Sequence, residues 1–311
     1  MISPFVRQAR LPSRRRWVAG ASVAGIKLEA RFYETYEMCS VVEGVLRQPY
    51  EYARSLEGFH CDGQWAGWLS PFPKVSALHQ FIDFVVHGVH DEQAERVDLE
   101  QRLATHRHFA SLPAAISDLK PHILPIELAF AHHGIDHLSF VQHLADTGRK
   151  FDGAEDDDVY DYMFEIALSE AYEALMQQTV AEVFHVLFQN RSLLLSFNEY
   201  VSGILERSDP ASAQGYDLSR LAKSGTLRRT KPPMWARRAV FFRDRGQCVL
   251  CERDLTGLVN LDNVENFDHI VPLALHGIND VSNLQLLCVP CNQGDKKAKR
   301  GVTSNRYQTW Y

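Results

Sequence analysis

The sequence predicts an α+β protein in which a mostly α-helical N-terminal domain precedes a small C-terminal domain held together by zinc. Two observations favour this class. Apolar residues in the first two thirds recur at helical spacing, and four of the six cysteines form two Cys-x-x-Cys pairs near the C-terminus. The length of 311 residues fits two domains at ~150 residues each.

Several segments of the first two thirds have the apolar spacing of amphipathic helices. They are Pro125–His133, Asp158–Gln189 and Leu193–Glu206. The acids Glu155–Asp158 stand where the helix dipole favours negative charge, and Gly134 is a helix stop. Leu78–His87 fits either a helix or a buried strand, and residues 1–75 remain ambiguous.

The composition changes at residues 208–233, where Pro, Gly and basic residues cluster as in a linker. We therefore divide the chain into an acidic helical domain at 1–207, a basic linker at 208–233 and a second domain at 234–311. The N-terminal domain resembles no family, and we expect it to regulate, sense or bind a protein partner or a second copy.

The net charge of −6 is distributed unevenly. Residues 208–311 contain 15 Lys and Arg against 10 Asp and Glu, a net charge of +5, which leaves −11 for residues 1–207. The C-terminal part is therefore the candidate for binding a polyanion such as DNA. No run of about 18 apolar residues occurs, so we expect no membrane partner.

The paired cysteines predict a structural zinc site. Cys248, Cys251, Cys288 and Cys291 supply the four sulfur ligands that Zn²⁺ prefers in tetrahedral sites. We expect no export signal, and in a reducing cytoplasm such pairs indicate a metal site rather than disulfides. The alternative is four unrelated buried cysteines.

A second cluster lies between the two cysteine pairs. Asp268 offers a carboxylate suited to Mg²⁺ or Mn²⁺, and Asn292 offers an amide oxygen for the same ion. An imidazole ordinarily titrates near neutral pH, so a histidine such as His269 is suited to take a proton from water. A base and a metal site at one place fit phosphodiester hydrolysis. The bland alternatives are a surface turn for the Asp-His pair and a helix cap for Asn292.

Basic residues near this cluster are candidates for phosphate contacts. They are Lys296, Lys297, Lys299 and Arg300 after the last cysteine, and Arg237 and Arg238 in a short helix expected over Trp235–Arg245. For that short helix, a solvated charged face is an equally good interpretation.

Residues 235–301 resemble the HNH endonuclease family. The shared pattern is Cys-x-x-Cys, Asp-His-Ile-x-Pro-Leu, an Asn 14 residues after His269, and a second Cys-x-x-Cys followed by Asn. The resemblance implies a β-hairpin followed by a helix around one metal ion, the ββα-metal fold. Where some members carry a further His, this chain has Lys296.

The resemblance also implies roles for individual residues. His269 is the general base, Asp268 and Asn292 hold the catalytic ion, and Asn283 braces the loop that orients His269. Asn283 has a second interpretation as a purely structural turn residue.

We thus expect a metal-dependent DNA endonuclease, a nickase or double-strand nuclease, of the kind found in bacterial restriction or phage-defence effectors. The alternative is a non-catalytic zinc module that binds nucleic acid or protein.

Overall fold

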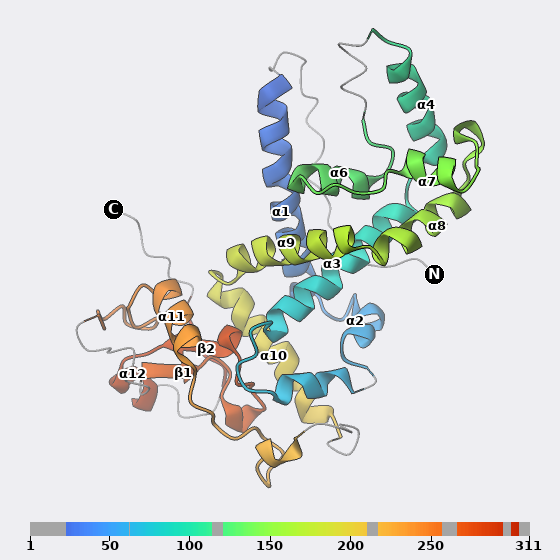
Figure 1. Ribbon diagram of the computed structural model, residues 1–311. Coiled ribbons are helices and arrows are strands. Elements are labelled where there is room, and N and C mark those ends of the chain that lie inside the picture. The colour runs from blue at the N-terminus through green and yellow to red at the C-terminus, as the bar shows by residue number, and fades with distance from the viewer. Residues whose placement is uncertain are drawn as a thin grey trace. The chain divides into compact units, whose positions relative to one another are not determined.

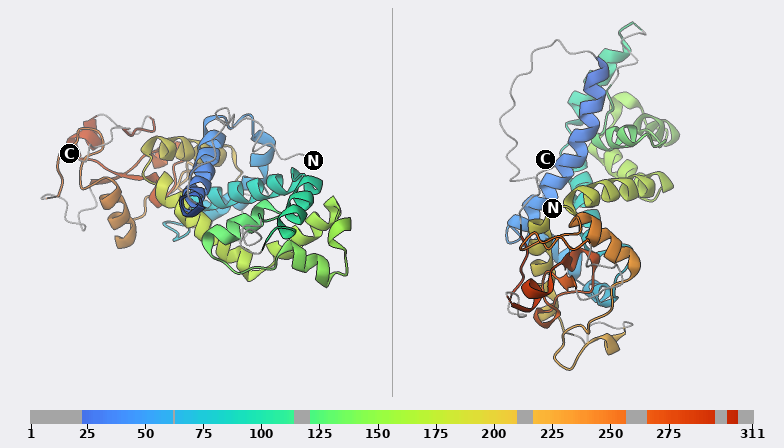
Figure 2. Two further views of the ribbon diagram at one scale, coloured as in Figure 1. Left: turned by 90° about the horizontal axis from the view of Figure 1, so that it is seen from above. Right: turned by 90° about the vertical axis from the view of Figure 1, so that its left-hand side faces the viewer.

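The computed structural model describes residues 23–61, 63–113, 121–209, 217–256, 266–294 and 300–304, with side chains from residue 34 onward. Helices make up most of this part of the chain, and the named strands belong to its C-terminal region (Figures 1 and 2). This confirms the predicted α+β class. Within the described residues, no helix is both long and apolar enough to cross a bilayer.

Helices follow one another along most of the described chain. In chain order they include α1 (Val23–Arg47), α2 (Ala53–His60), α3 (Ala77–Glu95), α4 (Leu99–Ala110), α6 (Pro125–His133), α7 (Phe140–Asp146), α8 (Asp156–Ala167), α9 (Glu170–Leu187), α10 (Arg191–Arg207), α11 (Met234–Arg243) and α12 (Val289–Gly294). Short 3₁₀ turns add η1 (Gln64–Leu69), η2 (Phe151–Gly153), η4 (Leu218–Arg220), η6 (Leu273–Leu275) and η7 (Val281–Asn283).

The sequence predicted one helix over Asp158–Gln189. This prediction was wrong, because the segment forms two helices, α8 and α9. The break falls at Ser169, whose hydroxyl accepts a hydrogen bond from the Tyr172 amide at 3.1 Å and so caps the start of α9. The same hydroxyl donates to the Ile166 carbonyl at 2.7 Å and closes the end of α8. Apolar periodicity continues through this break, which is why it hides the cap.

Other predicted helices are confirmed. α6 has the predicted bounds and stops at Gly134, whose φ of 66° lies in the left-handed region that glycine adopts freely. α10 extends the predicted Leu193–Glu206 by two residues at its start and one at its end. The ambiguous segment Leu78–His87 lies inside the helix α3.

The strands form one antiparallel pair. β1 (Phe267–His269) pairs with β2 (Leu284–Leu286), so that Phe267 faces Leu286 and His269 faces Leu284. α12 begins three residues after β2 ends. The order β1, β2, α12 is the strand–strand–helix arrangement that the sequence predicted.

The chain divides into two compact units. One comprises the residues up to Val42 together with Asp83–Val183, and the other comprises Glu43–Ile82 together with Phe184 onward. The second unit therefore joins α10 and residues 43–82 to the 234–311 segment, whereas the division made from the sequence assigns them to the N-terminal domain.

Aromatic side chains from distant parts of the sequence build the core of the second unit. Phe81, Phe197 and Phe267 are fully buried, and they come from α3, α10 and β1. The rings of Phe81 and Phe197 have centroids 5.5 Å apart, and Phe59 of α2 packs edge-on against Phe81 at 5.1 Å. The second unit thus buries large aromatic side chains from segments far apart in the sequence.

Candidate active site and metal centre

The first cysteine pair lies on a tight turn. The Cys248 amide donates to the Arg253 carbonyl at 3.0 Å, and the Glu252 amide donates to the Cys248 carbonyl at 2.8 Å. Glu252 takes a φ of 61° to reverse the chain. The Val249 amide donates to the Leu286 carbonyl at 3.0 Å, which attaches the turn to β2.

The second pair follows β2 directly, with Cys291 inside α12. The Sγ atoms of Cys248, Cys251, Cys288 and Cys291 all lie within 4.8 Å of one another. The sulfurs of Cys251 and Cys288 are 3.6 Å apart. A tetrahedral ion with metal–sulfur bonds of about 2.3 Å requires sulfur–sulfur distances of about 3.8 Å. The four thiols therefore fit the ligand set of one metal ion.

The thiols of this cluster differ in their affinity for a proton. A backbone hydrogen bond from Arg253 lowers the pKa of Cys251 to about 7. Burial raises the pKa of Cys288 and of Cys291 above the usual value for a thiol. Thiolates are the form that binds metal, and a bound cation favours that form at each position.

Asp268 and His269 are neighbours on β1. The His269 side chain is buried, at 3% exposure, and Asp268 is half-buried. The register of the sheet places Asp268 opposite Gln285 and His269 opposite Leu284, both fully buried. The carboxylate and the imidazole thus belong to the last two residues of β1 in a short antiparallel pair of strands.

Asn283 immediately precedes β2 and is fully buried. Its side-chain oxygen accepts from the Val271 amide at 2.8 Å, and its Nδ2 donates to the carbonyls of Val271 at 3.0 Å and Ile278 at 2.9 Å. Its backbone carbonyl accepts from the Ile270 amide at 2.7 Å. Asn283 therefore hydrogen-bonds to both ends of the loop that follows His269.

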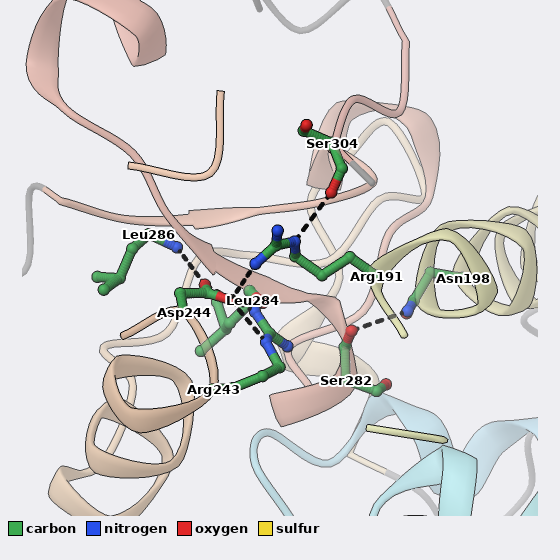
Figure 3. Close-up of polar contacts among 8 residues, drawn as sticks. All are labelled: Arg191, Asn198, Arg243, Asp244, Ser282, Leu284, Leu286 and Ser304. Atoms are coloured by element: carbon green, nitrogen blue, oxygen red, sulfur yellow. Dashed lines mark hydrogen bonds and ion pairs between the residues drawn. The ribbon is translucent and has the colours of Figure 1, made fainter. Parts of the chain in front are cut away.

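A buried ionic network holds the other edge of β2 (Figure 3). The Asp244 carboxylate accepts from Arg243 at 2.8 and 2.9 Å and from the Leu286 amide at 2.9 Å. Arg243 also donates to the Leu284 carbonyl at 2.6 Å. Arg191 of α10 approaches the same carboxylate at 3.4 Å and donates to the Ser304 carbonyl at 2.9 Å.

These contacts give β2 polar partners on both of its edges. On one edge lies β1, and on the other lie the side chains of Arg243 and Asp244. Position and register of the Asp268–His269 strand thus depend on residues outside the predicted motif.

The loop after His269 is fixed from further segments. The Phe72 amide donates to the Asn279 carbonyl at 2.7 Å, and the Ala77 amide donates to the Asp280 carboxylate at 3.0 Å, which caps α3. Burial raises the pKa of Asp280. From α10, the side-chain Nδ2 of Asn198 donates to the Ser282 carbonyl at 3.1 Å.

The basic candidates occupy different environments. Arg237 is buried, at 6% exposure, whereas Arg238 and Arg300 are exposed. Lys296, Lys297 and Lys299 lie outside the described residues. Arg238 and Arg300 are therefore the members of this set that the described surface presents to a ligand.

Asn292 lies in the middle of α12, one residue after Cys291, and is half-buried. Its backbone N–H donates to the Cys288 carbonyl at 2.9 Å. Cys291 of the cysteine cluster and the candidate ligand Asn292 consequently share one short helix.

Sequence reasoning missed Arg191, Asp244 and Asn279 as elements of this site. Arg191 and Asn279 give no local signal, because each contacts partners more than 45 residues away. The pair Arg243-Asp244 stands just before the first cysteine pair, and an acid in an otherwise basic segment was the available clue.

The fold and the cysteine cluster together define a small ββα domain with a four-cysteine metal site. Residues 248–297 match the family model described as HNH endonuclease. The matched range contains all four clustered cysteines, Asp268, His269, Asn283 and Asn292. The chain therefore contains an HNH nuclease domain, which implies a nucleic-acid substrate. No curated protein and no solved structure matches the chain.

Proposed function

We propose that this protein is a metal-dependent endonuclease that hydrolyses phosphodiester bonds of DNA. The observation that carries the proposal is the family match over a segment whose Asp-His pair lies on β1 and whose Asn283 braces the adjoining loop. A module that only bound nucleic acid would need the four cysteines but not this triad of Asp268, His269 and Asn283.

Zn²⁺ is the proposed occupant of the four-cysteine cluster. An all-sulfur set of four ligands suits Zn²⁺ and is poor for Mg²⁺ or Mn²⁺, which prefer oxygen. Its role there is structural, because four protein ligands leave no open position for substrate.

Asp268 and Asn292 are the proposed ligands of a catalytic Mg²⁺ or Mn²⁺. A carboxylate and an amide oxygen form a hard donor set of the kind such ions prefer. When bound, the ion supplies Lewis-acid stabilisation of charge developing on the phosphate oxygens.

The protein's own residues supply the proton transfer and the positioning. His269 accepts the proton of the attacking water as general base. Asn283 keeps the loop that follows His269 in place through its side-chain hydrogen bonds. The phosphates that flank the cleaved bond are bound by basic residues, namely Arg238, Lys296, Lys297, Lys299 and Arg300. Arg237 is buried and is therefore better placed to support its helix than to contact DNA.

Two observations support a proposal for the biological setting: the acidic N-terminal part is joined to a basic C-terminal part, and the arrangement is similar to that of bacterial restriction and phage-defence effectors. The nuclease acts in the cytoplasm as a restriction or phage-defence effector, and the acidic N-terminal part controls it through a partner or a second copy. Cytoplasmic reduction keeps the four cysteines available for metal.

The decisive experiment is cleavage of supercoiled plasmid by the full chain with Mg²⁺ or Mn²⁺ and with EDTA. We expect metal-dependent conversion to open-circle or linear DNA, lost in His269→Ala. His276→Asn is the matched control, because it removes the other histidine of the domain at a φ of 58° that Asn tolerates. Equal cleavage by His269→Ala and the unmodified protein would refute the role of His269.

The proposed defence role has its own test. Cells expressing the full chain should reduce phage plating relative to cells expressing His269→Ala at equal protein levels. Equal plating for a panel of phages, with cleavage of plasmid intact in vitro, would remove the defence role and leave the nuclease.

A further inference from the structure

Figure 1 shows where helix α8 (Asp156–Ala167) lies in the fold. With its cap Leu168, this helix has two apolar faces. One face is buried and contains Val159, Tyr162 and Ile166. The opposite face contains Tyr160, Phe164 and Leu168, spaced four residues apart, with exposures of 57%, 71% and 76%. A helix that covers a core on one side needs only one apolar face, so the second has another use.

The size of the exposed face is that of a binding anchor. The exposed parts of the Tyr160 and Phe164 rings amount to roughly 250 Å² if a full ring side chain offers about 200 Å². Scattered single apolar residues are normal on a surface, but three at i, i+4 and i+8 form a continuous ridge. Such a ridge fits the mode in which a helix inserts its anchors into an apolar groove.

The surroundings of this ridge are strongly acidic. Asp157 and Asp161 flank the ridge and are exposed, and so are Asp156 and Glu165. Residues 151–190 contain no Lys or Arg at all. Glu165 contacts His143 at 2.6 Å, but none of the three aspartates forms an ion pair with a described residue.

We propose that Tyr160, Phe164 and Leu168 form a docking ridge for a separate protein whose apolar groove is rimmed by Lys and Arg. The acid rim makes a second copy of this face a poor partner, because like charges would meet across the interface. It equally repels DNA and anionic lipid. A groove with a basic rim is the surface that satisfies both the apolar ridge and its charge.

The test begins with p-benzoylphenylalanine incorporated at position 164 of the full chain, followed by irradiation in the native cells. Position 50 is the matched control, because Tyr50 is also an aromatic residue and is 93% exposed but has no neighbouring ridge. We expect a crosslinked protein at position 164 that is absent at position 50. Mass spectrometry of the crosslinked peptide should place it on a surface rich in Lys and Arg.

The purified partner is then titrated against the full chain by fluorescence anisotropy at 50 and 300 mM NaCl. Phe164→Ala should weaken binding by at least about 30-fold, as expected for a central aromatic anchor. Asp157→Lys with Asp161→Lys should weaken binding at low salt and flatten its salt dependence. All three sites are exposed, so plasmid cleavage by these variants should match the unmodified protein. Thermal unfolding should also match, apart from the small helix-dipole contribution that Asp157→Lys removes from the first turn of α8.

Several outcomes would overturn the proposal. They are equal crosslinking at positions 164 and 50, a crosslink only to a second copy or within the same chain, and a partner whose binding ignores the charge reversal. Binding is measured without reference to DNA cleavage, so failure here is separable from failure of the proposed nuclease function.

Discussion

Asp244→Asn tests whether the buried carboxylate of Asp244 stabilises the second unit. The Asp244 and Arg243 side chains are 0% and 1% exposed, and Arg191 is 16% exposed. Asn keeps the shape of the side chain but removes its negative charge. The guanidinium groups of Arg191 and Arg243 would then lie close together with no anion to balance their positive charges. Breaking a buried ion pair in this way costs about 3–5 kcal/mol of unfolding free energy.

The assay is urea unfolding of the full chain followed by tryptophan fluorescence. Of the five tryptophans in the chain, Trp65, Trp68 and Trp235 are described residues of the second unit, so most of the signal comes from the unit that contains Asp244. A loss of about 3–5 kcal/mol is a large part of the 5–15 kcal/mol typical of a whole domain, so the midpoint should fall clearly.

The matched control is Asp217→Asn, which removes an exposed carboxylate that contacts Arg220 at 3.2 Å. Exposed pairs contribute little, so its urea midpoint should not change. If Asp244→Asn unfolds at the same urea concentration as Asp217→Asn, the charge of Asp244 does not stabilise this unit and the reasoning from burial is wrong.

Further predictions concern the brace, the metal, pH and the minimal folded fragment. Asn283→Asp should lose the donors to Val271 and Ile278 and reduce cleavage at least tenfold while zinc content stays constant; unchanged cleavage would contradict the bracing role. One zinc per chain should be found by atomic absorption and lost in Cys288→Ser, whereas Cys61→Ser, the exposed cysteine outside the cluster, should retain it. Burial lowers the pKa of His79 from 6.5 to about 4. Between these two pH values the unfolded chain binds a proton at His79 that the folded chain does not bind. The free energy of unfolding should therefore decrease as the pH is lowered from 6.5 to 4. Urea unfolding at a series of pH values should show a smaller decrease in stability for His79→Phe. The same pH profile for both proteins would contradict this role of His79. Residues 234–311 expressed alone should not unfold cooperatively, because they lack the contacts from α3 and α10; a sharp transition would show that those contacts are dispensable.

Local pattern was sufficient for several helices. α6 could be predicted to the residue because Pro125 opens it and Gly134 closes it, and both act through their own backbone. The break at Ser169 escaped prediction because apolar spacing persists across it while one hydroxyl makes the cap. Helix or strand at Leu78–His87 could not be decided from a short apolar run, since either structure can bury it.

The four cysteines and the Asp268–His269 pair were identifiable from the sequence alone. Their chemistry depends on residue type and on short spacings, and a Cys-x-x-Cys turn brings two sulfurs to one ion whatever surrounds it. The order of strand, strand and helix followed from the same motif.

Only the tertiary structure decided what supports that site. The contacts of Arg191 with Asp244 and of Asp280 with the start of α3 join residues 53 and 203 positions apart. The exposed second face of α8 likewise became visible only once its buried face was known. Periodicity shows that a residue can be buried, but which residues meet is determined by the packing of distant segments, because a small nuclease motif has too little core to stand without them.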